Sequence, residues 1–117
     1  MSDDLEPWVI PAEQLLSGEP QARAGFLYKA PDDRVWIAVW TCTPGAFWSR
    51  YVGDETIYFI AGEASITDQD GRSATYGPGD LIHVPAGSKC TWQIKQPVRM
   101  VFHYLAADAN QPGARLD

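Results

Sequence analysis

The chain has 117 residues and a formal net charge of −6 at pH 7, with 45% hydrophobic and 12% aromatic residues. A single domain near this length buries roughly 65% of the surface of its unfolded chain, which suffices for one core but not for a second folded domain. The nine lysines and arginines are scattered singly, which argues against nucleic acid as a partner, and no run approaches the roughly 20 apolar residues that cross a bilayer.

The N-terminal residues M-S-D-D-L-E-P-W are acidic and lack the basic start and apolar core of a signal peptide. We therefore expect a cytoplasmic protein. In that compartment Cys42 and Cys90 are predicted to be reduced thiols packed in the interior, because disulfides are rare there.

Residues 1–33 are predicted to form an irregular lead-in that packs on the rest of the domain. Four prolines interrupt it, and one helical turn is expected at 12–16, after Pro11. The segment also contains several apolar residues that are unlike a free tail, so we expect them to cover a sheet edge, in this subunit or in a neighbour. These residues are Leu5, Trp8, Val9 and Ile10.

From Arg34 the pattern changes to an alternation of period two, which predicts a strand over 34–42. One face of this strand carries Trp36, Ala38, Trp40 and Cys42. The opposite face is also largely apolar, as in a strand of a two-sheet sandwich.

Short extended runs separated by glycine and proline turns follow to the end of the domain. Strands are predicted at 47–51, 55–60, 63–67, 72–76, 81–84, 89–94 and 98–105. A hairpin loop is expected at 68–71, with the last two strands joined by a loop at 95–97 and a loose tail at 106–117. This order indicates a single all-β domain, an antiparallel sandwich or barrel.

Two segments place glycine, proline and glutamate at the spacing of the two cupin motifs. The first contains Gly45, Glu55 and Gly62, and the second contains Gly79, Pro85, Gly87 and Cys90. Over residues 34–105 the chain resembles the cupin superfamily and, within it, the small-cupin family named for (S)-ureidoglycine aminohydrolase. The finer resemblance depends on the motifs W-T-C-T-P-G-A-F, D-E-T-I-Y-F-I-A-G-E, Y-G-P-G-D and V-P-A-G-S-K-C-T-W. It implies a jelly-roll barrel, or double-stranded β-helix, and a homodimer joined by sheet edges and the N-terminal segment.

The resemblance also shows where a metal would be expected, since metal-binding cupins supply three histidines and one glutamate at four motif positions. Here those positions hold Ser49, Tyr51, Glu55 and Cys90. Serine is a poor ligand for a transition metal and a phenol must lose its proton to bind well, so no tightly bound metal and no other cofactor are predicted. If a divalent metal is present, its predicted ligands are Glu55, Cys90 and His103, provided that His103 lies on the inner face.

Individual residues at the motif positions have both structural and functional interpretations. A carboxylate inside an aromatic barrel has a raised pKa, which suits Glu55 to general acid or base catalysis, although it could equally be held by structural hydrogen bonds. Cys90 is expected to be a neutral thiol in the pocket wall. His83 and His103 are expected to be half-buried and hydrogen-bonded, as histidines usually are.

Three functions are compatible with these residues. The first is a small-molecule-binding cupin whose pocket is lined by Trp40, Ser49, Tyr51, Glu55, Cys90 and Trp92, with the two indoles able to stack on a planar ligand. The second is an enzyme acting on a small nitrogenous metabolite such as a ureide or amide, with Glu55 as the catalytic acid or base. The third is a barrel that is purely structural or binds a protein partner.

Overall fold

The computed structural model describes residues 5–107, and these residues form an all-β domain, as predicted. Its elements are β1 (Glu6–Trp8), the 3-10 turn η1 (Ala12–Gln14), β2 (Leu15–Ser17), β3 (Ala22–Lys29), β4 (Val35–Cys42), β5 (Gly45–Arg50), β6 (Gly53–Thr67), β7 (Ser73–Tyr76), β8 (Leu81–Val84) and β9 (Lys89–Ala106). Within the described part of the chain, no helix is long and apolar enough to span a membrane.

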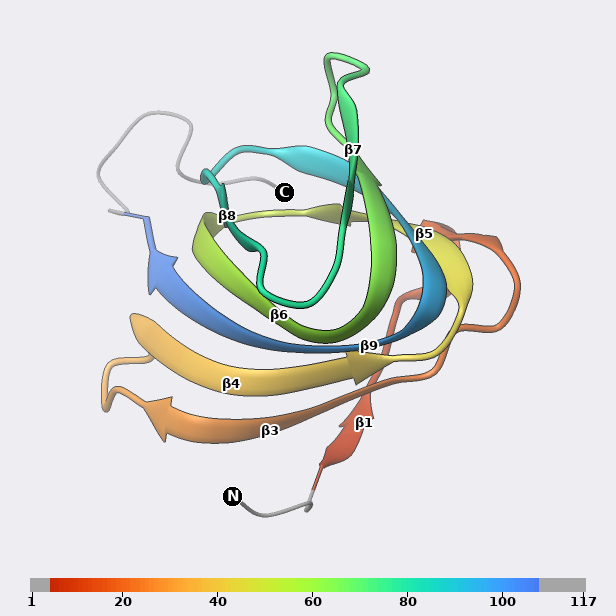
Figure 1. Ribbon diagram of the computed structural model, residues 1–117. Helices are drawn as coiled ribbons and strands as arrows, with labels where there is room; N and C mark the ends of the chain where they lie inside the picture. The colour runs from red at the N-terminus through yellow and green to blue at the C-terminus, as the bar shows by residue number, and fades with distance from the viewer. Residues whose placement is uncertain (1–4, 108–117) are drawn as a thin grey trace.

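The two longest strands, β6 and β9, organise the sheet. The first half of β9 pairs with β5 and the second half with β4, while β6 pairs along the other edge of β9. The remaining strands extend this arrangement, with β3 and β1 beyond β4, β2 beside β5, and β7 and β8 on β6. Figure 1 shows how β6 and β9 bend, so that the antiparallel sheet curls around an enclosed interior.

The alternation predicted for 34–42 correctly identifies the inner face of β4. Ala38, Trp40 and Cys42 belong to the buried core, and Trp36 packs against it. Cys42 and Cys90 are free, buried thiols, as expected. Alternate residues of β5, β6 and β9 complete the core, because successive side chains of a strand point to opposite faces of the sheet.

The expectation of an irregular lead-in before residue 34 is wrong for the strands β1, β2 and β3. Strand β3 occupies Ala22–Lys29 and pairs with β4 along its length, and β1 pairs with β3. Proline and glycine around these strands concealed them from pattern analysis. The predicted helical turn is present in shorter form, as η1 over Ala12–Gln14.

The predicted loop at 95–97 is also absent, because β9 continues through it. Pairing with β6 persists on both sides of Pro97, with register shifts that absorb the irregularity. Proline is tolerated at such shifts because no ladder hydrogen bond is required from its nitrogen. The strand ends at Ala106, so most of the predicted tail lies outside the described residues.

Candidate functional site

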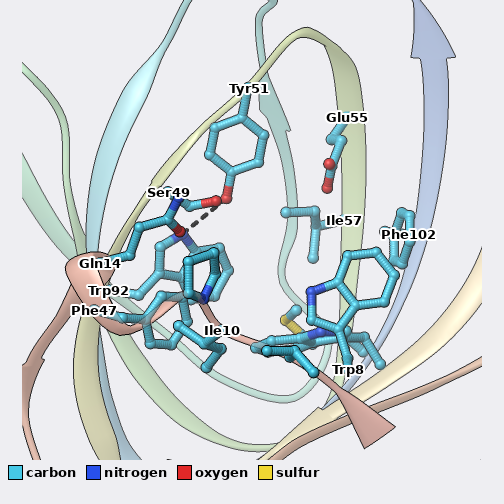
Figure 2. Close-up of a pocket in the computed structure, with 14 residues that line it drawn as sticks. Trp8, Ile10, Gln14, Phe47, Ser49, Tyr51, Glu55, Ile57, Trp92 and Phe102 are labelled. Atoms are coloured by element: carbon cyan, nitrogen blue, oxygen red, sulfur yellow. Dashed lines mark hydrogen bonds between the residues drawn. The ribbon is translucent and has the colours of Figure 1, made fainter. Parts of the chain in front are cut away.

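A cavity of about 100 Å³ lies between the N-terminal segment and the inner face of the barrel. Five of the six residues predicted to bind a ligand line it, namely Trp40, Ser49, Tyr51, Glu55 and Trp92. Figure 2 shows Tyr51 and Glu55 on opposite sides of this cavity, with their polar ends directed into it. The sequence motifs therefore bring these groups together around one space.

Strand alternation explains why these side chains face inward. Ser49 lies on β5, and Glu55 and Ile57 lie two residues apart on β6, so both of the latter leave the same face. Trp92 lies on β9 directly opposite Phe47 of β5, and the two rings stack with an interplanar angle of 5°. The aromatic wall is thus held by neighbouring strands of the rigid sheet.

Tyr51 is buried and makes one well-defined polar contact. The indole Nε1 of Trp92 donates a hydrogen bond of 2.8 Å to the Tyr51 hydroxyl. Burial is the largest cause of a raised pKa at Tyr51, and negative charge at Glu55 and Cys90 raises it further. Hydrogen bonds with Trp92 and Ser49 lower the pKa, but by less than the other causes raise it. The phenol therefore stays neutral and cannot act as an anionic ligand at ordinary pH.

Glu55 differs from Tyr51 because its carboxyl group has no hydrogen-bond or ion-pair partner among residues 5–107. Burial raises the pKa of Glu55 from its ordinary value of 4.5 to about 7. Near neutral pH the group therefore exchanges readily between a proton donor and a carboxylate. Such a group at a cavity wall can bind a polar ligand or transfer a proton.

Cys90 does not share this cavity, contrary to prediction. It lines a second cavity of about 360 Å³, at the end of the barrel formed by β8 and the β6–β7 hairpin. Burial and then the nearby Asp68 carboxylate raise the pKa of the Cys90 thiol. The thiol is therefore neutral, as expected. It lies opposite Ser49 on the neighbouring strand and influences the pKa of Tyr51, but it does not line the cavity that holds Glu55.

The histidines also lie elsewhere than predicted. On β9 the buried residues are Met100 and Phe102, so the alternation places His103 on the outer face, where it is exposed. His83 is exposed too, with its Nε2 3.3 Å from Asp54 Oδ1. The predicted substitute ligand set of Glu55, Cys90 and His103 is therefore not assembled.

The described residues do not fit the metal site that the cupin motifs imply. Within residues 5–107, no group of three or more histidine, cysteine or acidic side chains is placed to hold a metal ion. At the motif positions, the Tyr51 hydroxyl already accepts a hydrogen bond and Cys90 faces another cavity. We therefore assign no chemical step to a bound metal, and the metal content of the protein stays a prediction.

Sequence reasoning missed several residues of the cavity wall. The N-terminal segment contributes Trp8, Ile10 and Gln14, and the barrel adds Phe47 and Phe102. The apolar run W-V-I within an acidic terminus was the available signal, and it was assigned to a sheet edge. β1 does pair with β3 at the edge of the sheet, and Trp8 at its end also contacts the inner-face residue Phe102, with ring centroids 6.4 Å apart.

Comparison with known structures places this geometry among cupins. The EutQ protein of Clostridium difficile has 22% identity and a TM-score of 0.66, over 82% of this chain and 72% of that one, which shows a shared fold. A cupin superfamily protein from Desulfitobacterium hafniense has 26% identity and a TM-score of 0.64, over 73% and 77% of the two chains. A DUF861-family protein of unknown function from Pseudomonas syringae has 26% identity and a TM-score of 0.77, with 86% of this chain spanning 43% of that one.

No curated protein matches the chain. A family model described as the EutQ-like cupin domain matches residues 29–102, which includes β4 to β8 and most of β9. The narrower resemblance to the ureidoglycine aminohydrolase family stays a prediction. By its family match and its curled antiparallel sheet, the chain belongs to the EutQ-like cupin domain family.

Proposed function

We propose that this chain is a small-molecule-binding cupin whose ligand occupies the cavity between the N-terminal segment and the barrel. The observation that carries the proposal is the Glu55 carboxyl, which lies at the cavity wall without a partner among residues 5–107. The Glu55 side chain is half-buried, and a carboxyl group at a cavity wall without a protein partner favours a ligand that completes its bonding.

The cavity size limits the ligand to a compact molecule. A cavity of about 150 Å³ accommodates benzene, so the 100 Å³ found here suits a ligand with fewer buried atoms. The stacked rings of Phe47 and Trp92 provide an apolar surface, while Ser49 and Glu55 provide polar contacts. This combination is typical of pockets that orient a small ligand through few polar groups.

A second candidate function is catalysis on a small nitrogenous metabolite. Its support is the Glu55 pKa of about 7, which lets the same group give and accept a proton near neutrality. The resemblance to the ureidoglycine aminohydrolase family suggests ureides or amides as substrates. In this alternative Glu55 is the catalytic acid or base, and the aromatic wall orients the substrate.

Binding is tested by thermal denaturation with a panel of ureides, amides, amines and sugar acids. A ligand present at 100 times its dissociation constant should add about 2.7 kcal/mol to the free energy of unfolding. Ser49→Leu, which fills part of the cavity, should remove the stabilisation, whereas Arg72→Ala in the wall of the second cavity should retain it. Stabilisation that survives Ser49→Leu, or none across the panel, would contradict the proposal.

A compound that binds then separates the two functions. For catalysis, Glu55→Gln should abolish product formation while the compound still binds, because the amide keeps the shape but transfers no proton. A compound that binds and is recovered unchanged supports the binding function alone.

A further inference from the structure

The wall of the Glu55 cavity has an unusual balance of side chains. Six aromatic residues line it, namely Trp8, Trp40, Phe47, Tyr51, Trp92 and Phe102. Among the described residues of the wall, Glu55 is the one charged side chain, and none is lysine, arginine or histidine. We propose that the cavity selects a small alkylammonium ion, which contacts the aromatic faces and pairs with the Glu55 carboxylate. This inference rests on the small-molecule function proposed above.

The aromatic rings of the wall differ in orientation. Trp40 is inclined by 60° to both Phe47 and Trp92, and Trp8 is inclined by 76° to Phe102. Rings at such angles present faces in several directions, and an aromatic face carries negative potential that attracts a cation. Figure 2 shows the Trp8 indole on the same side of the cavity as Glu55, and both residues line the cavity.

Charge around Glu55 favours a cation over an anion. The titratable groups that interact with the Glu55 carboxylate are the phenols of Tyr51 and Tyr104, whose pKa values are raised, so neither supplies a charge. An anionic ligand would meet the carboxylate without a compensating cation in the described wall, whereas an ammonium ion would provide the missing partner. The chain's net charge of −6 adds a general attraction for cations.

The proposal is tested by calorimetric titration at pH 8.5, where Glu55 is ionised. The probes are butylammonium and butan-1-ol, which is its uncharged isostere, and both have fewer non-hydrogen atoms than benzene. Butylammonium should bind, and butan-1-ol should bind about tenfold more weakly or not at all, since a desolvated cation–π contact and ion pair together exceed about 1.4 kcal/mol. Equal affinity for butylammonium and butan-1-ol would overturn the proposal.

Variants separate the two predicted contacts. Glu55→Gln should weaken cation binding about tenfold, while Glu13→Gln, an exposed carboxylate beside the cavity residue Gln14, should leave it unchanged. Trp8 is 37% exposed, so the Trp8→Leu variant should fold. It should bind the cation more weakly while its affinity for the alcohol stays unchanged. Trp8→Phe should restore most of the affinity for the cation, because it restores an aromatic face. Equal losses of cation and alcohol in Trp8→Leu would indicate apolar packing alone and overturn the cation–π contact.

The failure of this inference can be distinguished from the failure of the proposed function. If butylammonium does not bind but another compound of the panel stabilises the protein through the Ser49 cavity, the ligand class is wrong and the binding function stands. If no compound binds there, both are wrong.

Discussion

Tyr51 and Glu55 face one cavity but differ in how their burial is compensated. The Tyr51 hydroxyl accepts a hydrogen bond from Trp92, and the phenol is neutral, so its burial costs little. The Glu55 carboxyl has no such contact among residues 5–107, and its charged form is therefore disfavoured. A folded protein retains this kind of unfavourable group where a ligand or a reaction uses it.

The raised pKa of Glu55 predicts a stability change with pH. Folding raises this pKa from 4.5 to about 7, so the folded state holds the proton more tightly, and stability falls as the pH rises from about 5 to 8. Ionisation of Glu55 should lower the free energy of unfolding by roughly 2–4 kcal/mol over this range, and the decrease should disappear in Glu55→Gln. Urea denaturation at both pH values measures it. Glu19→Gln, which removes an exposed carboxylate, should behave like the unmodified protein. Equal pH dependence in Glu55→Gln would contradict the prediction.

Among the strands, β6 and β9 are the longest and must bend together to close the barrel. Their register shifts three times between Phe59 and Ala64, around Gly62, which has a φ of 86° and faces Pro97 across the pair. A Cβ at Gly62 would lie 2.0 Å from the Pro97 carbonyl oxygen. Glycine therefore permits both the backbone conformation and the close approach of the two strands.

Gly62 and Gly71 offer a matched test of this close approach. Gly71 has nearly the same φ, 83°, but a Cβ there would meet nothing within 4 Å. Gly71→Ala should thus cost about 1–2 kcal/mol from backbone strain, and Gly62→Ala should cost a further 1–3 kcal/mol or prevent folding, because two backbones must separate. Urea denaturation of both variants measures the difference. Equal losses would show that the contact with Pro97 contributes nothing.

Across the domain, the outer face of the sheet carries an apolar row. Val101, Tyr58 and Leu81 are successive cross-strand neighbours on β9, β6 and β8, and the row ends at Val39 of β4, which is buried. Tyr58 is 46% exposed and Leu81 is 66% exposed. Apolar surface of this kind commonly contacts another protein, and a two-fold dimer would bury it on both copies.

The homodimer inferred from the sequence remains a prediction, and this row allows a direct test. Leu81→Lys should raise the dimer dissociation constant at least about tenfold, since a charge replaces an apolar contact, while Glu19→Lys should not. Light scattering after size-exclusion chromatography measures both. If Leu81→Lys leaves the dimer unaffected, the two copies contact each other elsewhere, for example at the sheet edges that the sequence suggested. If the unmodified protein is monomeric, the prediction of a homodimer is wrong.

Local patterns in the chain were enough to predict the fold class and most strands from β4 onward. The resemblance to cupins implied the six proposed ligand residues, five of which line the cavity. Strand alternation and motif spacing place Ser49, Glu55 and Trp92 on one face without knowledge of distant contacts. The same alternation could not tell which face of β9 is the inner one beside His103. The inner face is the one whose side chains pack into the core, and either the face with Met100 and Phe102 or the face with His103 could do so.

Which groups share a space depends on how the strands pack in three dimensions. Cys90 satisfies the motif spacing, yet the closure of the barrel places it in the wall of the cavity beside the β6–β7 hairpin and not in the wall of the Glu55 cavity. Trp8 lies far from the motifs in sequence, and the pairing of β1 with β3 brings it over the cavity. Contacts between residues distant in the chain arise from the global packing of strands, and no local pattern encodes them.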